Sequence, residues 1–203
     1  MSDISDLRKR EQTFLYECPE LGIERDKTGA LHGLLYRYFM ASTFAADVRN
    51  YDSMMDYGCG SGAGTELLAV NFVEAWGVDK DPTAHEYAKK MHYRSGVRYV
   101  TSIDDVHPSK PMGFVSIIEC VEHMKTEEAK ALLLKIRPMM APEGVLFMTT
   151  PLALNKSGFS DNPWHVHEYQ PIELKDLVFS AGFREPSVFS PGEVAQIMLA
   201  AKA

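Results

Sequence analysis

Asp56-Tyr57-Gly58-Cys59-Gly60-Ser61-Gly62 is a glycine-rich stretch between an apolar pair, Met54-Met55, and a helix-like run, Glu66-Leu67-Leu68-Ala69. A second apolar segment follows and ends at Asp79. Glycines let the backbone pass close to a ligand where a Cβ would collide, and the amides at the start of the next helix point at that ligand. The Asp79 carboxylate can accept hydrogen bonds from the two hydroxyls of a ribose. The pattern therefore predicts a nucleoside-binding unit.

Apolar and helix-like runs alternate along the chain from Tyr51 onward. The strand candidates are Ser53–Tyr57, Ala75–Asp79, Arg98–Ser102, Gly113–Ile118 and Gly144–Thr149, and the helix candidates are Gly64–Asn71, Pro82–His92, Thr126–Met140 and Ile172–Ala181. This alternation predicts a parallel sheet with helices on both faces. Two further extended candidates, Glu185–Ser190 and Gln196–Lys202, are separated by a Pro-Gly turn. They are expected to pair as an antiparallel hairpin.

The expected architecture is an α/β fold: a doubly wound, mostly parallel sheet of seven strands with a C-terminal antiparallel hairpin. A length of 203 residues fits one domain with a full-sized core. Residues 1–50 contain two helix candidates, Asp6–Tyr16 and Leu31–Val48. We expect residues 1–50 to form an N-terminal helical cap within the same domain and residues 51–203 to form the core.

Composition and charge limit the classes of function. The net charge of −7 argues against attraction to nucleic acid or to an anionic membrane surface. Cys18, Cys59 and Cys120 are odd in number and far apart, which argues against a disulfide framework or a cysteine zinc site and for a reducing compartment. The N-terminus is polar, with no apolar signal region, and no run reaches the length of a membrane span. The expected location is the cytoplasm.

Two nucleoside-binding families share features of the glycine stretch. Gly58, Gly60 and Ala63 match the dinucleotide fingerprint G-x-G-x-x-G/A, which is a weak signal alone. The chain resembles class I S-adenosylmethionine-dependent methyltransferases in more places. The D-x-G-C-G-S-G string that begins at Asp56 is typical of that family, and so is the terminal hairpin. The chain also leaves no room for a second substrate domain of the usual dehydrogenase kind.

The resemblance covers about residues 30–203 and implies S-adenosylmethionine as cofactor. It implies that Asp56 and the turn backbone hold the methionine end, that Asp79 binds the ribose beside Lys80, and that the Ser102-Ile103 corner contacts the adenine. Asp104 could join that corner or be an exposed turn residue. The cofactor-binding residues that follow from the resemblance are Asp56, Gly58, Cys59, Gly60, Gly62, Asp79, Lys80, Ser102, Ile103 and Glu119.

Two further clusters carry titratable side chains. Glu119-Cys120-Val121-Glu122-His123 lies where the fourth strand is expected to end, which is the ligand edge of an open α/β sheet. In a helical turn, Glu119, Glu122 and His123 would share one face. His165 and His167 follow the fifth strand and would point the same way in an extended chain. We expect this second segment to return over the same edge.

Three interpretations of these clusters stay open. In the first, the side chains are structural, as E-x-x-E-H strings are in many methyltransferases that need no metal. In the second, Glu122, His123 and His165 are catalytic and accept the proton of a hydroxyl or amine as the methyl arrives. In the third, Glu119, Glu122, His123 and His165 bind a divalent cation. That arrangement resembles the small-RNA terminal 2′-O-methyltransferases, but the acidic charge and the lack of an RNA-binding extension do not favour it.

The overall pattern is also similar to small bacterial methyltransferases with a Glu-x-x-Glu-His turn and an Asn-Pro-x-His-Val-x-Glu-Tyr loop, and in part to ubiquinone-pathway O-methyltransferases. In these relatives an N-terminal helix closes over the cofactor. The lid candidates are His32, Tyr36, Arg37 and Tyr38, with Arg37 opposite the cofactor carboxylate; alternatively, the two tyrosines are core residues. Trp164 is a candidate for stacking on a substrate.

The expected function is methyl transfer from S-adenosylmethionine to an oxygen or nitrogen nucleophile of a small molecule. Metal-assisted RNA 2′-O-methylation and a non-catalytic cofactor-binding subunit are the alternatives.

Overall fold

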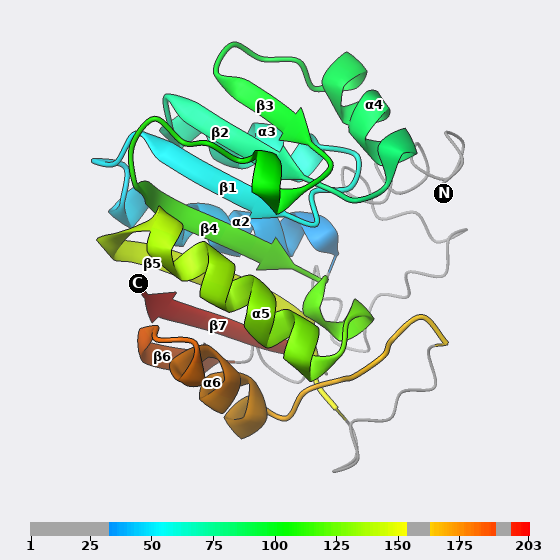
Figure 1. The fold of residues 1–203 in the computed structure, drawn as a ribbon, viewed down its shortest axis with the longest axis vertical. Helices are drawn as coiled ribbons and strands as arrows, with labels where there is room; N and C mark the ends of the chain where they lie inside the picture. Colours follow the sequence, from blue (N-terminus) through cyan, green and yellow to red (C-terminus); the bar gives the residue numbers. More distant parts are fainter. Residues whose placement is uncertain (1–32, 154–162, 190–195) are drawn as a thin grey trace.

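The computed structural model describes residues 33–153, 163–189 and 196–203 of the chain (Figure 1). Seven strands form one sheet in the order β3-β2-β1-β4-β5-β7-β6. The strands are β1 (Ser53–Tyr57), β2 (Glu74–Val78), β3 (Val97–Val100), β4 (Met112–Ile118), β5 (Met140–Pro151), β6 (Arg184–Phe189) and β7 (Gln196–Lys202). The strands β1 to β5 are parallel, and β7 runs antiparallel between β5 and β6. The expected fold class is confirmed, including the antiparallel pairing of the last two strands.

Helices cover both faces of the sheet (Figure 1). The α-helices are α2 (Leu34–Asp47), α3 (Ala63–Leu68), α4 (Pro82–Met91), α5 (Thr126–Ile136) and α6 (Pro171–Ser180), and 3₁₀ turns lie at η2 (Ala69–Asn71), η3 (Ile103–Asp105), η4 (Val121–His123) and η5 (Arg137–Met139). Helices α2 and α3 pack on one face, and α5 and α6 pack on the other.

The two hydrophobic cores follow the period of a strand. Met54 joins the core beneath α2 and α3, whereas its neighbour Met55 joins the core beneath α5 and α6. Successive side chains of a strand point to opposite faces of the sheet. The two methionines therefore pack into the hydrophobic cores on opposite faces. All seven residues of β4 are buried, which explains why the central strand reads as a continuous apolar run rather than an alternating one.

The order of the strands fixes where a ligand can bind. From β1 the chain proceeds through β2 to β3 on one side, and then crosses back to β4 and β5 on the other side. The carboxyl ends of β1 and β4 are therefore adjacent at a topological switch point. Open α/β sheets bind their ligands in the crevice outside such a point.

Most element boundaries agree with the sequence to within two residues, but four do not. Helix α3 ends at Leu68 rather than Asn71 and continues only as the turn η2. Strand β5 begins at Met140, four residues before the expected Gly144, because Pro142 and Gly144 stay in the strand beside a register shift between β4 and β5. Helix α5 ends at Ile136 and continues only as the turn η5. Helix α2 begins at Leu34 rather than Leu31.

The expected helix Asp6–Tyr16 lies outside the described residues. Within the described ranges, every helix is too short or too polar to cross a membrane.

Candidate functional site

The glycine turn connects β1 to α3 and is anchored to the next strand. The amides of Gly58 and Cys59 donate hydrogen bonds of 2.8 and 3.1 Å to the carbonyl oxygen of Val78, the last residue of β2. An added Cβ on Gly58 would lie 2.7 Å from the Sγ atom of Cys120, which no real contact allows. Gly58 therefore has to be a glycine, because the turn passes here between the ends of β2 and β4 and leaves no space for a side chain.

The turn is closed on one side and open on the other. Gly60 and Gly62 have positive φ angles of 53° and 89°, a region that only glycine adopts routinely. An added Cβ on Gly62 would lie 2.8 Å from the Cβ of Ala88, whereas one on Gly60 would meet nothing within 4 Å. A ligand can therefore approach the backbone at Gly60.

Asp79 lies beside this open position. Its Oδ2 atom accepts a hydrogen bond of 2.8 Å from the amide of Gly60, and its Oδ1 atom accepts one of 2.9 Å from the amide of Asp81. An ionised carboxylate has about four lone-pair sites. Two backbone donors thus orient the Asp79 carboxylate and leave lone pairs for a ligand with two hydroxyls.

Asp56 has a different environment. Its carboxylate is fully buried and accepts hydrogen bonds from three hydroxyls, those of Thr65 and Tyr38 to Oδ2 and that of Ser116 to Oδ1. Burial raises the pKa of Asp56 above its usual value, although the three hydroxyls oppose the rise. Burial and the neighbouring Asp56 also raise the pKa of Tyr38. The carboxylate thus ties β1 to α2, α3 and β4, and its contact with a cofactor stays a prediction.

The remaining cofactor candidates lie in the loops after β2 and β3. Lys80 is exposed directly after Asp79, and Ile103 is half-buried against the core in η3. The hydroxyl of Ser102 accepts a hydrogen bond of 3.2 Å from the amide of Asp104. The Asp104 carboxylate is exposed and accepts one of 2.8 Å from Lys135. These residues belong to the same edge as the glycine turn because β1, β2 and β3 are parallel.

The lid candidates separate into different roles. Tyr38 is buried in the core, and Tyr36 packs against that core while partly exposed. Arg37 lies 3.2 Å from the Oε2 atom of Glu119, which joins α2 to the end of β4. The Nε atom of Arg37 is buried with no hydrogen-bond partner among the described residues. His32 lies outside the described residues.

The expected helical face of the Glu-Cys-Val-Glu-His cluster does not form. Glu119 has a positive φ of 49°, and the 3₁₀ turn η4 begins only at Val121. The Oε1 atom of Glu119 accepts a hydrogen bond of 2.9 Å from the hydroxyl of Thr149, and its other oxygen faces Arg37. The Glu119 side chain thus contacts Thr149 and Arg37 rather than sharing a helical face with Glu122 and His123.

Glu122 is an almost completely buried carboxyl group, with 1% of its surface exposed. The hydroxyl of Thr150 donates a hydrogen bond of 3.0 Å to its Oε2 atom. Burial, reinforced by the charge of Glu119, raises the pKa of Glu122 to about 8. Its backbone carbonyl accepts hydrogen bonds from the amides of Val166 and His167, which holds the returning segment 163–169 over the same edge, as expected.

Hydrogen bonds fix which ring nitrogen of His123 and His165 carries a proton. The Nδ1 atom of His123 lies 2.8 Å from the carbonyl oxygen of Trp164, which can only accept. The Nδ1 atom of His165 lies 2.7 Å from the carboxylate of Glu168. In each neutral ring the lone pair is therefore on Nε2. The two rings meet edge to face at 5.2 Å.

Glu122, His123 and His165 each offer a ligand atom, and these atoms lie within 4.8 Å of one another. Three of the four predicted metal ligands are thus brought together, and Glu119 is not among them. The Oε1 atom of Glu122 is 3.9 Å from the Nε2 atom of His123. Sequence reasoning assigned no site role to Glu168, Thr149 or Thr150. Thr149 and Thr150 lie near the carboxyl end of β5, where Thr149 is paired in register with Ile118 of β4.

His165 and His167 contact different partners. The Nε2 atom of His167 is 2.6 Å from the carboxylate of Glu173, and its ring packs against Tyr169 at 4.6 Å. His167 therefore belongs to the base of α6 rather than to the cluster. Trp164 is 77% exposed on the rim of the site.

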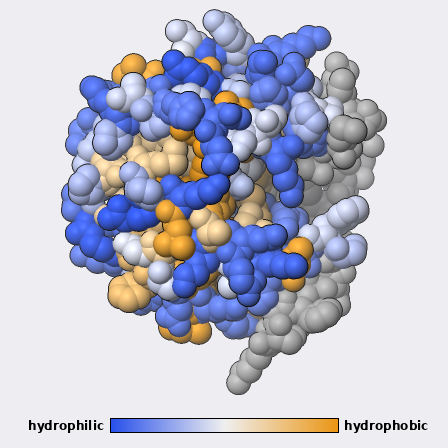
Figure 2. Space-filling model, in the orientation of Figure 1, coloured by the Kyte–Doolittle hydropathy of each residue, from blue (hydrophilic) through white to orange (hydrophobic). Residues whose placement is uncertain are grey.

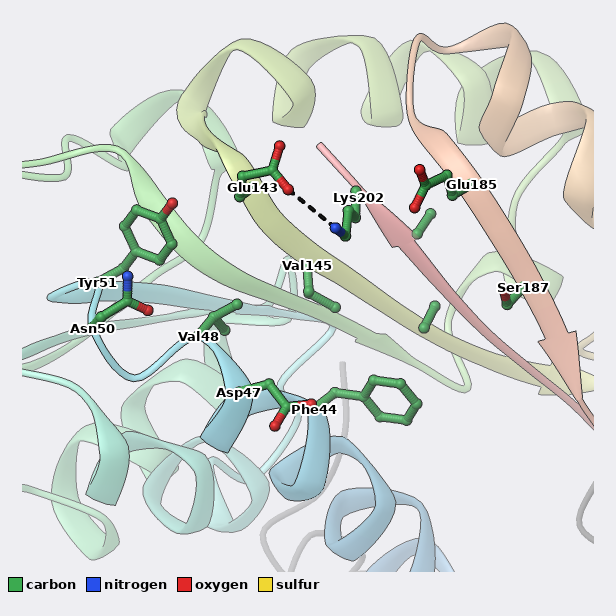
Figure 3. Close-up of a pocket in the computed structure, with 12 residues that line it drawn as sticks. Phe44, Asp47, Val48, Asn50, Tyr51, Glu143, Val145, Glu185, Ser187 and Lys202 are labelled. Atoms are coloured by element: carbon green, nitrogen blue, oxygen red, sulfur yellow. Dashed lines mark hydrogen bonds and ion pairs between the residues drawn. The ribbon is translucent and has the colours of Figure 1, made fainter.

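A groove of about 630 Å³ lies elsewhere on the molecule (Figure 3). Phe44, Val48 and Val145 contribute apolar surface, and Glu143 is joined to Lys202 at 3.1 Å. Glu143 belongs to the amino-terminal part of β5, whereas the glycine turn follows the carboxyl end of β1. This groove contains none of the predicted site residues.

Comparison with known proteins places the chain in a family. The family model of the methyltransferase domain matches residues 25–197. A protein of Mycobacterium tuberculosis strain H37Rv named "Probable S-adenosylmethionine-dependent methyltransferase" is 26% identical over 155 residues, which are 75% of this chain and 54% of that protein. A similarly named protein of Mycolicibacterium smegmatis is 26% identical over 133 residues, 64% of this chain and 51% of that protein. The chain spans about half the length of these curated relatives.

Solved structures show the same fold. The N-methyltransferase NodS of Bradyrhizobium japonicum has a TM-score of 0.65 at 14% identity and covers 83% of this chain and 94% of its own. A human N-acetylserotonin methyltransferase in complex with S-adenosylmethionine has a TM-score of 0.61 at 16% identity and covers 98% of this chain and 65% of its own. The glycine turn, the hydrogen bond between Gly60 and Asp79 and the strand order agree with this fold. The match over residues 25–197 shows that this chain belongs to the methyltransferase domain family.

Proposed function

We propose that this chain transfers a methyl group from S-adenosylmethionine to an oxygen or nitrogen nucleophile of a small molecule. The observation that carries this proposal is the Asp79 carboxylate, oriented by the amides of Gly60 and Asp81 beside the open side of the glycine turn. Its remaining lone pairs suit the two hydroxyls of a ribose. The names of the Mycobacterium and Mycolicibacterium relatives support the choice of cofactor.

S-adenosylmethionine, when bound, supplies a methyl group already activated on a sulfonium. The protein then has to orient two reactants and exclude water. Gly58, Cys59, Gly60 and Gly62 would follow the cofactor with their backbone, and Ser102 and Ile103 would border its adenine. Asp56 would act mainly by holding the strand end in place, because three hydroxyls already bind its carboxylate.

The acceptor would bind against Glu122, His123 and His165. Each imidazole contributes one ring nitrogen to the cluster, and in the absence of an ion a ring nitrogen with a lone pair could accept the hydrogen of a hydroxyl or amino group. These three residues lie at the end of β4 and in the segment after β5, across the switch point from the glycine turn. A methyl donor and a nucleophile could therefore meet there.

Charge and surface favour a small-molecule enzyme over the alternatives. The net charge of −7 offers no long-range attraction to RNA. The face of the molecule in Figure 2 is mostly hydrophilic, and its hydrophobic areas are interrupted, which does not favour a non-catalytic subunit that docks through this face. We also infer a reducing, cytoplasmic location, because Cys59 and Cys120 are free thiols.

A transfer assay tests this function. Methyl-labelled S-adenosylmethionine is incubated with the chain and with separate panels of phenols, sugars, carboxylic acids and short RNAs. We expect label in a small molecule, and label in RNA alone would overturn that part of the proposal. His123→Ala and His165→Ala should each lower kcat by roughly 100-fold or more and leave the Kd of S-adenosylhomocysteine nearly unchanged. His167→Ala is the matched control and should leave both intact; weakened cofactor binding with normal turnover in the first two variants would make those histidines structural.

A further inference from the structure

We propose that Glu122, His123 and His165 bind one divalent transition-metal ion, through which they hold the hydroxyl group of the acceptor. The role of the ion in methyl transfer rests on the proposed function, but the binding of the ion does not. Three donor atoms from two separate segments of the chain lie within 4.8 Å of one another. Bonds from Zn²⁺ to histidine nitrogen and carboxylate oxygen are about 2.0–2.2 Å long, so small rotations of the three side chains would close the site.

The hydrogen bonds of the imidazoles support this assignment. A histidine that binds a metal through Nε2 usually donates its Nδ1–H to a carboxylate or a backbone carbonyl, which fixes the tautomer and the plane of the ring. His165 does so to the Glu168 carboxylate, and His123 does so to the carbonyl oxygen of Trp164. Both rings are thus held in place, and each contributes one ring nitrogen to the cluster.

The carboxylate ligand is held in the same way. The hydroxyl of Thr150 binds the Oε2 atom of Glu122 and leaves the Oε1 atom facing His123. Each proposed ligand therefore has a hydrogen-bond partner: Thr150 for Glu122, Glu168 for His165 and the carbonyl oxygen of Trp164 for His123. Glu122 and Glu168 are both buried. Such partners orient metal ligands in natural sites, and their removal typically lowers metal affinity by about 10- to 100-fold.

The donor set selects the kind of ion. Two imidazole nitrogens and one carboxylate oxygen suit Zn²⁺, Co²⁺, Mn²⁺ or Fe²⁺, whereas Mg²⁺ and Ca²⁺ prefer sites made of oxygen alone. Three protein ligands also leave coordination positions open, as in catalytic rather than structural sites. A hydroxyl that fills an open position becomes easier to deprotonate and can release its proton to water, because the imidazole nitrogens bound to the ion can no longer accept it. This favours an oxygen nucleophile over an amine as the acceptor group.

Titration of the chelator-treated protein with metal salts tests the proposal. CoCl₂ should produce visible d–d absorption bands that saturate at one ion per chain, ZnCl₂ should abolish them by competition, and MgCl₂ at the same concentrations should have no effect. His165→Ala and Glu122→Gln should each weaken Co²⁺ binding by at least 10-fold, and Glu168→Gln by about 10- to 100-fold. His123→Ala is a further ligand variant, and it is expected to stay folded because 44% of the His123 side chain is exposed.

Two control variants make the assignment specific. His167→Ala removes the histidine that pairs with Glu173, and Glu119→Gln removes the carboxylate that pairs with Arg37. Both should bind Co²⁺ within about twofold of the wild type, which also separates the three-ligand site from the four-ligand set expected from the sequence. The proposal is overturned if Co²⁺ and Zn²⁺ do not bind at millimolar concentration, or if His165→Ala binds like the wild type.

Calorimetry with S-adenosylhomocysteine on the same samples separates the two claims. Cofactor binding without metal binding would overturn only the metal site. Metal binding without cofactor binding would overturn the proposed function and leave the site.

Discussion

The backbone amide of Gly60 donates a hydrogen bond of 2.8 Å to the carboxylate of Asp79, 19 residues further along the chain. The amide of Asp81 binds the other carboxylate oxygen at 2.9 Å. The glycine turn after β1 and the loop after β2 thus hold the carboxylate in one orientation before any ligand arrives. Groups that are already ordered lose little freedom on binding, so this arrangement favours affinity for a ribose.

Asp79→Ala should weaken the binding of S-adenosylhomocysteine by roughly 10- to 100-fold, because a lost hydrogen bond to a charged group costs about 1.5–3 kcal/mol. Calorimetry measures the Kd, and thermal unfolding checks that the variant is folded. Asp176→Ala, an exposed carboxylate on α6, is the control and should bind like the wild type. Unchanged affinity in Asp79→Ala would remove this residue from the cofactor site.

Gly62→Ala should destabilise the protein more than Gly182→Ala. Both glycines have a φ of 89°, so alanine at either position carries a similar backbone strain of about 1–2 kcal/mol. Only at Gly62 would the new Cβ also collide with the Cβ of Ala88, at 2.8 Å, which should add roughly 1–3 kcal/mol. Urea unfolding measures both losses. Equal losses would mean that the helix after the turn moves aside without penalty.

Tyr38→Phe should lower the free energy of unfolding by about 1–3 kcal/mol, because it leaves buried Asp56 with one donor fewer. Tyr93→Phe removes a hydroxyl from a side chain that is 81% exposed and should change stability by no more than about 0.5 kcal/mol. Chemical unfolding of both variants supplies the comparison. If the two losses are the same, the link between α2 and β1 does not contribute to stability.

The stability of the fold should depend on the ionisation of Glu74. Burial alone would raise the pKa of Glu74, but the amide and hydroxyl of Ser109, the hydroxyl of Ser53 and the charge of Arg98 together lower it below 4.5. Its stabilising contribution is therefore fully present above about pH 4.5 and is lost as the pH falls through the lowered pKa.

Glu74→Gln should consequently be less sensitive to acid than the wild type. Unfolding in urea at several pH values between about 3 and 7 measures the two dependences. The wild type should lose more stability than the variant over this range. Parallel curves for the two proteins would mean that the hydrogen-bonded carboxylate at Glu74 is not linked to folding.

The sequence predicted those parts of the molecule that depend on local pattern. Strands β1 and β7 have the expected bounds, because each is a short apolar run between turn residues. The glycine turn and Asp79 could be found because their chemistry requires particular residues at a particular spacing. His165 could be placed near His123 only because parallel strands bring their carboxyl ends to one edge.

The parts that depend on distant contacts could not be predicted. The three hydroxyl groups that bind Asp56 come from α2, α3 and β4. No spacing in the sequence predicts that these residues meet. Glu119 was expected on a helical face with Glu122, but its positive φ sends it towards Arg37 instead. A left-handed residue at a strand end has no sequence signal when it is a glutamate rather than a glycine or asparagine.

Calorimetric titration of the wild-type protein with S-adenosylhomocysteine tests the central claim most directly, because it requires no knowledge of the acceptor. We expect one site per chain with saturable binding at micromolar ligand, and we expect Asp79→Ala to weaken it. Absence of binding at millimolar S-adenosylhomocysteine to the folded protein would contradict the assignment of the glycine turn and Asp79 to this cofactor.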